Sequence, residues 1–179
     1  MSKVLVLVGH PNLAESKHNA ALVEAVRDLD HVTVHDLYAA YPDFALDGDA
    51  ERALLAEHDV IVFQHPVYWY NTTPLLRLWQ DLVLTHGWAF TTDGTASQTA
   101  GKKAVVAVTV GGSEGNYSPE GSNGRTIEEL LNNWDNTLRL CQFDTQQPYF
   151  KLHSTVFGVS DEDLAIAAKQ YRELLASFA

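Results

Sequence analysis

Three runs of consecutive apolar residues are the clearest pattern in the chain. They cover residues 4–8, 60–63 and 104–110, the last with Thr109 as its one polar residue. Unbroken apolar runs of this length are typical of strands buried on both faces of a parallel sheet. Two further segments, 31–37 and 148–153, alternate polar and apolar residues and therefore predict half-exposed strands. The pattern predicts three central strands and two edge strands.

Between these strands, apolar residues recur at helical spacing. The spacing predicts helices over residues 17–29, 50–57, 74–84 and 126–140, and a last helix after Ser160. Ser160 and Thr126 are typical N-caps, and Glu129 completes a capping box with Thr126. The segments 38–49, 87–101 and 111–121 are rich in Gly, Pro or polar residues and predict loops.

The alternation of strands and helices predicts an α/β fold with helices on both faces of one parallel sheet. The second and fifth strands have the edge pattern, which is what the strand order 2-1-3-4-5 requires. The chain of 179 residues has the length of one domain, and we expect residues 1–179 to form it.

Composition narrows the functional classes. The formal net charge of −11 argues against a nucleic acid partner and against docking on an anionic membrane by charge. The single cysteine cannot form an internal disulfide, and no apolar run approaches the roughly 20 residues of a membrane span, so a cytoplasmic protein is expected. The eight histidines form neither an HExxH motif nor a Cys/His cluster, and no metal site is predicted.

Ligands of such sheets bind beyond the carboxyl ends of the strands, where the strand order reverses. Three segments should meet there: the turn and helix start after the first strand, an aromatic loop over residues 66–71, and a glycine-rich segment over 109–117. They offer an anion site, flat aromatic surface and backbone that a planar ring can approach. The chain lacks GxGxxG and GxxxxGK[ST] motifs, so an FMN-type mononucleotide is favoured over a dinucleotide or ATP.

Each candidate residue also has an ordinary structural explanation. His10 can be a turn residue, Ser16 can serve only as a helix cap, and Lys17 and His18 can be solvated. The three adjacent aromatics after Val67 cannot all face one core, so at least one should meet a ligand or a partner.

Several motifs taken together resemble the flavodoxin-like NAD(P)H:quinone oxidoreductases. They are Gly9-His10-Pro11, Ser16-x-x-Asn19, Gln64-His65-Pro66-Val67-Tyr68-Trp69-Tyr70, Pro74-Leu75-Leu76-Arg77-x-Trp79-x-Asp81, Gly87-Trp88-Ala89-Phe90 and Thr109-x-Gly111-Gly112. Leu37-Tyr38 and Tyr41-Pro42-Asp43-Phe44 extend the likeness toward the ancillary subunits of glutathione-gated potassium-efflux systems. The resemblance covers the chain to about residue 125 and weakens beyond it.

The resemblance implies a flavodoxin-like sandwich that binds FMN, with FAD as the other possibility, and a homodimer with the site at the subunit interface. It implies ping-pong hydride transfer from NAD(P)H through the flavin to a quinone. By motif position, the phosphate and ribityl chain are assigned to His10, Ser16, Lys17, His18 and Asn19. The isoalloxazine is assigned to Pro66, Val67, Tyr68 and Trp69 on one side and to Thr109, Val110, Gly111 and Gly112 on the other.

The resemblance also assigns a catalytic part to Tyr117. Larger quinone reductases of this kind carry a Tyr at the matching place and a His six residues later, but this chain has Asn123 there. We therefore expect Tyr117 to donate a polarising hydrogen bond without a histidine partner.

Two other functions stay open at this point. One is a regulatory flavoprotein subunit that binds and activates a membrane potassium-efflux antiporter. The other is a one-electron flavodoxin-type carrier, which needs neither the aromatic loop nor the apolar helix over residues 74–84. The excess of large apolar residues in that helix suggests a contact with a second subunit.

Overall fold

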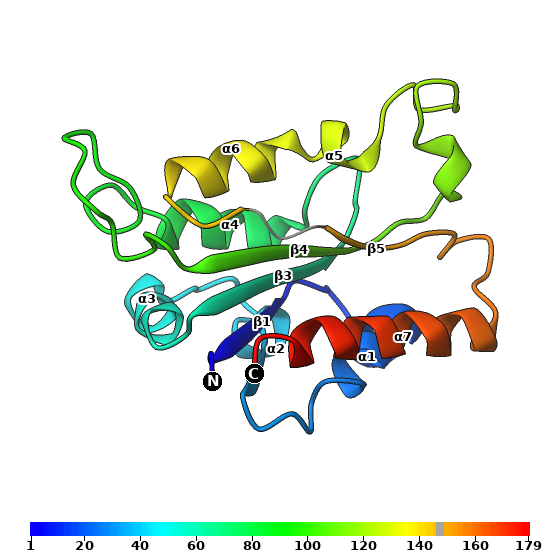
Figure 1. Ribbon diagram of the computed structural model, residues 1–179, viewed down its shortest axis with the longest axis horizontal. Coiled ribbons are helices and arrows are strands. Elements are labelled where there is room, and N and C mark those ends of the chain that lie inside the picture. Colours follow the sequence, from blue (N-terminus) through cyan, green and yellow to red (C-terminus); the bar gives the residue numbers. More distant parts are fainter. Residues whose placement is uncertain (146–148) are drawn as a thin grey trace.

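The computed structural model describes residues 1–145 and 149–179, and within them a five-stranded parallel sheet lies between two helical layers (Figure 1). The strands are β1 (Val4–Val8), β2 (Val32–Asp36), β3 (Val60–Pro66), β4 (Lys103–Thr109) and β5 (Phe150–Leu152). Their order is β2-β1-β3-β4-β5, which confirms the predicted order and the flavodoxin-like fold class.

The central strands are apolar over residues 4–8, 60–63 and 104–108 because both sheet faces are covered there. Val4, Val6 and Val8 of β1 pack with α1 (Lys17–Glu24) and α7 (Asp161–Ala176) on one face. Leu5 and Leu7 face the opposite layer, which contains α4 (Pro74–Val83) and α6 (Asn132–Leu140). The same alternation holds in β3 and β4. Side chains two residues apart therefore enter the same core, as strand geometry requires.

Several helix boundaries differ from the predicted ones. α1 ends at Glu24 rather than at residue 29, because Val26 N–H bonds to Val23 O and tightens the chain into turns. The short helix α2 (Leu37–Ala40), which the Asp36 carboxylate caps, takes the last residue of the predicted strand 31–37 and the first three of the predicted loop 38–49. The next helix, α3 (Gly48–Ala56), begins two residues before the predicted start because Asp47 caps it.

The second half of the chain shows two more corrections. The helix predicted over 126–140 is interrupted at Leu131, which separates α5 (Ile127–Leu130) from α6. The Thr126–Glu129 capping box is present at its start, as predicted. The predicted strand 148–153 is reduced to β5, and Pro148 lies outside the described residues.

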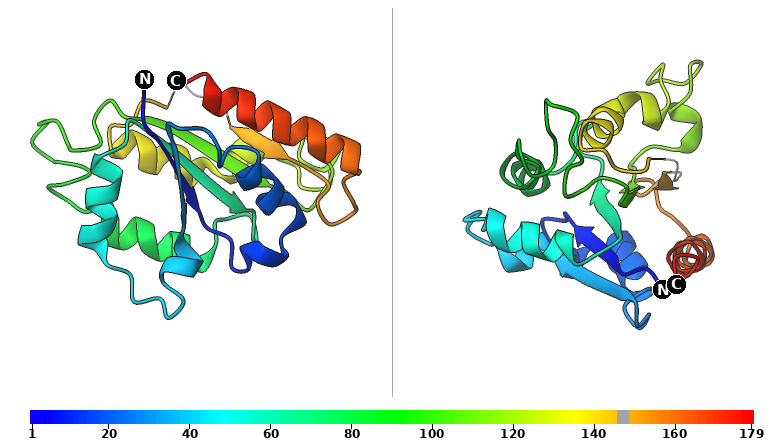
Figure 2. Two further views of the ribbon diagram at one scale, coloured as in Figure 1. Left: turned by 90° about the horizontal axis from the view of Figure 1, so that it is seen from below. Right: turned by 60° about the vertical axis from the view of Figure 1, so that its left-hand side comes forward.

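The remaining short elements are the 3-10 helices η1 (Leu13–Glu15) and η2 (Glu114–Asn116). The two termini lie side by side (Figure 2), where Ser2 N–H bonds to Phe178 O over 3.1 Å. Within the described residues, no helix has the length and hydropathy needed to span a bilayer.

Candidate functional site

The carboxyl ends of β1, β3 and β4 lie at one edge of the sheet, and the three predicted segments meet there. Backbone hydrogen bonds join them: Gly9 N–H bonds to Gln64 O, and Val67 N–H bonds to Thr109 O. Thr73 adds a side-chain bond, since its hydroxyl donates to Gly9 O over 2.8 Å. The first, third and fourth strands therefore end at one continuous surface formed by residues 9–19, 66–71 and 109–117, which we call the crest.

The helix start after β1 has the geometry of an anion site. Ser16 is the N-cap of α1, and its hydroxyl accepts the N–H of Asn19 over 3.1 Å. The other first-turn N–H groups have no acceptor within the helix and point out of its positive end. Nε2 of His18 is buried and has no hydrogen-bond partner among the described residues. An orphaned buried nitrogen beside a capped helix start fits a phosphorylated ligand.

A buried chain of hydrogen bonds lies directly beneath this helix start. Asn19 Nδ2 donates to the Thr109 hydroxyl over 2.9 Å, which ties the first segment to the glycine-rich one. Gln64 Nε2 donates to the backbone carbonyl of Asn19 over 3.1 Å, and the Tyr171 hydroxyl donates to Gln64 Oε1 over 3.0 Å. All four residues are buried. The network therefore sets the positions of Asn19 and Thr109 before any ligand arrives.

Two of the residues assigned to the phosphate are already engaged within the chain. The Lys17 ammonium pairs with Asp161 of α7 over 2.7 Å, which directs it along the surface. His10 is half-buried, and its Nδ1 accepts the N–H of Asn12 over 3.1 Å. Burial lowers the pKa of His10, against the field of Asp36, and burial also lowers the pKa of His18. Both imidazoles are therefore neutral hydrogen-bonding groups near pH 7.

The aromatic loop forms a tight turn. Tyr68 and Asn71 exchange two backbone hydrogen bonds of 2.9 and 3.0 Å across it. Its two central residues, Trp69 and Tyr70, have φ values of 49° and 61°. Non-glycine residues adopt such angles at a cost of order 1–3 kcal/mol each. The turn leaves the Trp69 side chain 94% exposed at its tip. The strained backbone holds a large flat side chain out of the core, where a ligand or a second subunit can meet it.

The glycine-rich segment owes its glycines to packing within the chain. A methyl group on Gly111 would lie 2.9 Å from Cγ2 of Val156, and one on Gly112 would lie 3.0 Å from Cε2 of Tyr117. Val110 is buried, and its N–H bonds to Leu152 O. The close backbone approach that we predicted for a ligand is thus already required by Val156 and Tyr117.

A histidine from elsewhere in the chain lies beside Tyr117, and the expectation that Tyr117 acts without a histidine partner stays a prediction. The His153 ring lies 5.8 Å from the Tyr117 ring between centroids, at an interplanar angle of 49°. Asn123 instead accepts a hydrogen bond from the Tyr70 hydroxyl over 2.9 Å and so faces the aromatic turn. His153 comes from the end of β5, far along the chain, and no local motif could have identified it.

His65, a residue that sequence reasoning left without a role, fixes the base of the aromatic loop. It is fully buried at the end of β3, bonds through Nδ1 to Pro66 O over 2.8 Å, and accepts the Trp134 indole N–H at Nε2 over 3.1 Å. These partners assign the proton to Nδ1. Burial lowers the pKa of His65 to about 4, so the ring is neutral in its buried position.

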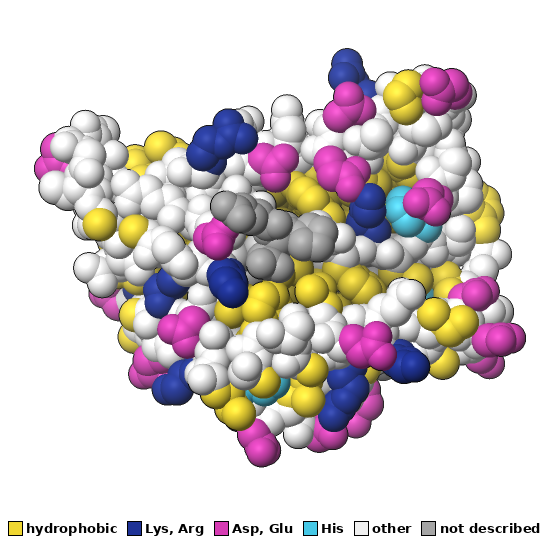
Figure 3. Space-filling view, viewed as in Figure 1, with side chains coloured by type: hydrophobic (Ala, Val, Ile, Leu, Met, Phe, Trp, Pro, Cys, Tyr) yellow, Lys and Arg dark blue, Asp and Glu magenta, His cyan; other side chains and the backbone are white. Residues whose placement is uncertain are grey.

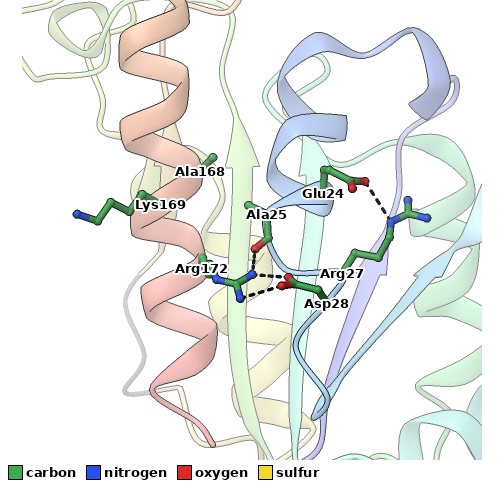
Figure 4. Close-up of a pocket in the computed structure, with 7 residues that line it drawn as sticks. All are labelled: Glu24, Ala25, Arg27, Asp28, Ala168, Lys169 and Arg172. Carbon is green, nitrogen blue, oxygen red and sulfur yellow. Dashed lines mark hydrogen bonds and ion pairs between the residues drawn. The ribbon is translucent and has the colours of Figure 1, made fainter.

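A surface groove of about 510 Å³ lies away from this crest, between α1 and α7 (Figure 4). Its arginines are neutralised: Arg172 donates to Ala25 O and pairs with Asp28, while Arg27 pairs with Glu24. On the face seen in Figure 3, Lys and Arg side chains are interspersed with acidic ones. Neither feature gathers unpaired charge, so the crest remains the candidate site.

The crest can do three things chemically: hold an anion at the start of α1, border a planar ring with aromatic side chains, and present the Tyr117 hydroxyl. Burial, and then the nearby Tyr70, raise the pKa of Tyr117, so its hydroxyl is protonated and able to donate at neutral pH. This donor set fits a phosphorylated planar ligand.

Comparison with known proteins gives a consistent family. The family model described as "Flavodoxin-like fold" matches residues 2–175. The chain is 44% identical over 129 residues to an uncharacterized NAD(P)H oxidoreductase, YrkL, of Bacillus subtilis, covering 72% of this chain and 73% of that protein. It is 39% identical to the glutathione-regulated potassium-efflux system ancillary protein KefG of Pectobacterium carotovorum, covering 98% and 93%. The crystal structure of general stress protein 14 of Treponema denticola in complex with FMN superposes with a TM-score of 0.90 at 34% identity, covering 99% of each chain.

Proposed function

Because this chain belongs to the flavodoxin-like fold family, we propose that it binds FMN at the crest and acts as an FMN-dependent NAD(P)H:quinone oxidoreductase. Similarity to an NAD(P)H oxidoreductase and to a protein crystallised with FMN supports the cofactor and the electron donor. The quinone acceptor and the ping-pong order are our extension of that similarity.

The observation that carries the proposal is the linkage of the three segments at the crest. Asn19 bonds to Thr109, Thr109 accepts from Val67, and Tyr70 bonds to Asn123. A ligand held there contacts a helix start, an aromatic turn and a phenol at once. FMN presents a phosphate, a polyol and a flat ring in one molecule, which is the combination that these groups suit.

The residues divide the work by chemistry. Ser16, His18 and the first-turn N–H groups of α1 hold the phosphate through hydrogen bonds and the helix dipole. Pro66, Val67, Tyr68 and Trp69 border the ring and exclude water from one side. Bound at these residues, FMN would supply the hydride-transfer chemistry that links NAD(P)H to a quinone. Tyr117 donates its hydroxyl hydrogen at the ring edge.

The cofactor is tested by titrating purified full-length protein with FMN and following quenching of flavin fluorescence. We expect Ser16→Ala to weaken FMN binding by about tenfold, since it removes one hydrogen-bonding group from the anion site at the start of α1. Ser160→Ala is the matched control. Ser160 caps α7 in the same way, by accepting the N–H of Asp163 over 3.0 Å, but the first turn of α7 carries three carboxylates, which repel an anion. Equal losses of FMN affinity in both variants, or absence of FMN binding by the wild type, would contradict the proposal.

The reaction is tested with the FMN-loaded protein under anaerobic conditions. Stopped-flow reduction by NADPH and by NADH identifies the donor, and reoxidation by a soluble benzoquinone tests the acceptor. A ping-pong mechanism predicts parallel lines in double-reciprocal plots when both substrates are varied. A stable semiquinone during titration with dithionite, together with slow quinone reduction, would favour a one-electron carrier instead.

We also propose that two copies associate, with the site at their interface. Trp69 is 94% exposed at the crest, and Leu82 of α4 is 41% exposed in a helix whose inward face is already full. Light scattering after size exclusion should give about twice the 19.8 kDa of one chain. A monomer at micromolar concentration would contradict the dimer.

The alternative function is that of a regulatory subunit of a potassium-efflux antiporter. The 39% identity to KefG over nearly the whole chain favours it. The test is co-purification with an antiporter encoded beside the gene, and potassium-efflux measurements with and without this protein. The two functions are compatible, and a cytoplasmic position next to such a partner stays a prediction.

A further inference from the structure

A cavity of about 270 Å³ lies beside the first segment of the crest, and the proposed function leaves it unused. It is formed where η1, α1 and the end of β2 meet. Four apolar residues of η1 and α1 line it, among them Leu13 and Val23, together with the charged side chains of Glu24, Arg27 and Asp36. Pockets for whole drug-sized ligands begin at roughly 300 Å³, so this cavity suits a single nucleoside.

Asp36 brings a carboxylate to the carboxyl end of β2, where it lies opposite Val8 of β1 in the register of the sheet. Its Oδ1 atom accepts the N–H groups of Tyr38 and Ala39 over 3.0 and 3.2 Å and so caps α2. Its Oδ2 atom receives no hydrogen bond from any residue that the structure describes. One oxygen of this half-buried carboxylate is therefore available to a ligand in the cavity.

The cation that lines the cavity is already paired. Arg27 Nε lies 3.3 Å from Glu24 Oε2, and Figure 4 shows this pair on the side of α1 that is turned away from Arg172. The cavity therefore has two carboxylates against one guanidinium, and the guanidinium is held by one of them. The remaining charge is the negative charge of Asp36.

This combination matches the adenosine half of a dinucleotide that carries no 2′-phosphate. A purine is a flat ring with largely apolar faces, which the apolar lining can cover. Carboxylates accept hydrogen bonds from the adenosine ribose of NAD, whereas sites for NADP place an arginine near the 2′-phosphate. In this chain the arginine is bound to Glu24, and Asp36 would repel a phosphate.

The cavity lies within reach of the rest of the crest. Leu13 and Ala14 line it and also belong to the crest. The order β2-β1-β3-β4 sets the end of β2 about 10 Å from the end of β3 and about 14 Å from that of β4, at about 4.8 Å between neighbouring strands. An extended dinucleotide with its adenosine beside Asp36 can therefore bring its nicotinamide to the loops after β3 and β4, where the flavin ring is proposed to lie.

We propose that this cavity binds the adenosine of NADH and that Asp36 selects NADH over NADPH as the electron donor, an inference that rests on the proposed oxidoreductase function. Oδ2 of Asp36 accepts a hydrogen bond from the ribose. The same oxygen repels the 2′-phosphate of NADPH, and Glu24 keeps Arg27 from compensating that repulsion.

The first test measures binding without turnover. ADP-ribose, which is NADH without its nicotinamide, is titrated into the full-length protein at saturating FMN and followed by backbone amide NMR. The amides of Ala14 and Val23 should shift, because both residues line the cavity. The 2′-phosphorylated ADP-ribose should bind at least about tenfold more weakly, since repulsion replaces a charge-assisted hydrogen bond.

Asp36→Asn removes the charge and keeps an oxygen that can cap α2, so the fold should be retained. It should weaken ADP-ribose binding by about tenfold. Asp30→Asn is the matched control, because it removes the same charge just before β2, outside the lining of the cavity. It should bind ADP-ribose like the wild type.

The second test compares NADH and NADPH as donors to a soluble benzoquinone. The wild type should favour NADH by at least about tenfold in kcat/KM. Asp36→Asn should reduce this preference by about tenfold through KM for NADH and keep kcat within about twofold, because Asp36 binds the ribose and not the reacting atoms. Glu24→Gln should raise kcat/KM for NADPH by about fivefold, the Coulomb effect of one charge at about 4 Å in water, since Arg27 is then released to meet the 2′-phosphate. Asp30→Asn should match the wild type with both donors.

The adenosine of FAD has the same chemistry, and a third measurement distinguishes this source. The ratio of FAD affinity to FMN affinity should be equal in Asp36→Asn and the wild type. A selective loss of FAD affinity would overturn the assignment to NADH. A wild type that prefers NADPH, or ADP-ribose that shifts amides only away from the cavity, would overturn it as well. ADP-ribose bound at the cavity of a protein that neither binds FMN nor oxidises NADH would instead overturn the proposed oxidoreductase and leave the adenosine site standing.

Discussion

Acid should weaken this fold through His65, and the size of the effect follows from the burial of that ring. In the folded state its pKa is about 4, because burial opposes charging more strongly than the hydrogen bond to Pro66 O favours it. In the unfolded chain the same group has the ordinary value of 6.5. As the pH falls below about 6.5, the unfolded state therefore takes up a proton that the folded state refuses.

The free energy of unfolding consequently falls by about 1.4 kcal/mol for each pH unit between about 6.5 and about 4, so the loss due to His65 reaches about 3 kcal/mol. Above pH 6.5 the contribution is complete and constant. Urea unfolding followed by far-UV circular dichroism at pH 7, 6, 5 and 4.5 measures this dependence.

The variant His65→Gln isolates the effect from other titrating groups. It should be less stable at pH 7 by about 1–3 kcal/mol, because the hydrogen bonds to Pro66 and Trp134 are disturbed. Below pH 6.5 its free energy of unfolding should fall less steeply with decreasing pH than that of the wild type, because one fewer proton is taken up on unfolding. His86→Gln is the exposed control and should follow the wild type. Equal pH slopes in His65→Gln and the wild type would refute the reasoning.

Three further predictions concern other buried groups. Tyr171→Phe leaves Gln64 Oε1 without its donor and should lower the free energy of unfolding by about 1–3 kcal/mol and weaken FMN binding, which urea unfolding and fluorescence titration check. Gly9→Ala places a methyl group 2.9 Å from Cβ of Leu76 and should cost about 1–3 kcal/mol in the same unfolding assay. Burial raises the pKa of Cys141 to about 11, so its thiol should react with a chromogenic disulfide at pH 8 only after unfolding.

Much of the fold could be predicted because it depends on local patterns. The apolar runs indicate strands covered on both faces and the alternating segments indicate strands covered on one face, and this difference separates central from edge strands. Helix ends were less predictable. Apolar spacing continues through residue 29, but the backbone turns at Val26, and the helix after Thr126 is interrupted at Leu131.

The candidate site shows the same division. Ser16 as a cap and the exposed aromatic turn could be anticipated from residue type and position. The bonds of Asn19 to Thr109 and of Tyr171 to Gln64 could not, since they join side chains from different elements. The assignment of ligand contacts to the crest residues stays a prediction for the FMN titrations to test.

The amino-acid sequence by itself determined the layered α/β architecture and the edge of the sheet at which chemistry is possible, because periodicity in hydrophobicity is written in neighbouring residues. Only the tertiary structure decided which groups share that edge. His153 reaches Tyr117 because β5 pairs with β4 in a register that sets Leu152 opposite Thr109. Register depends on packing across the whole sheet, so it brings together residues that no local motif connects.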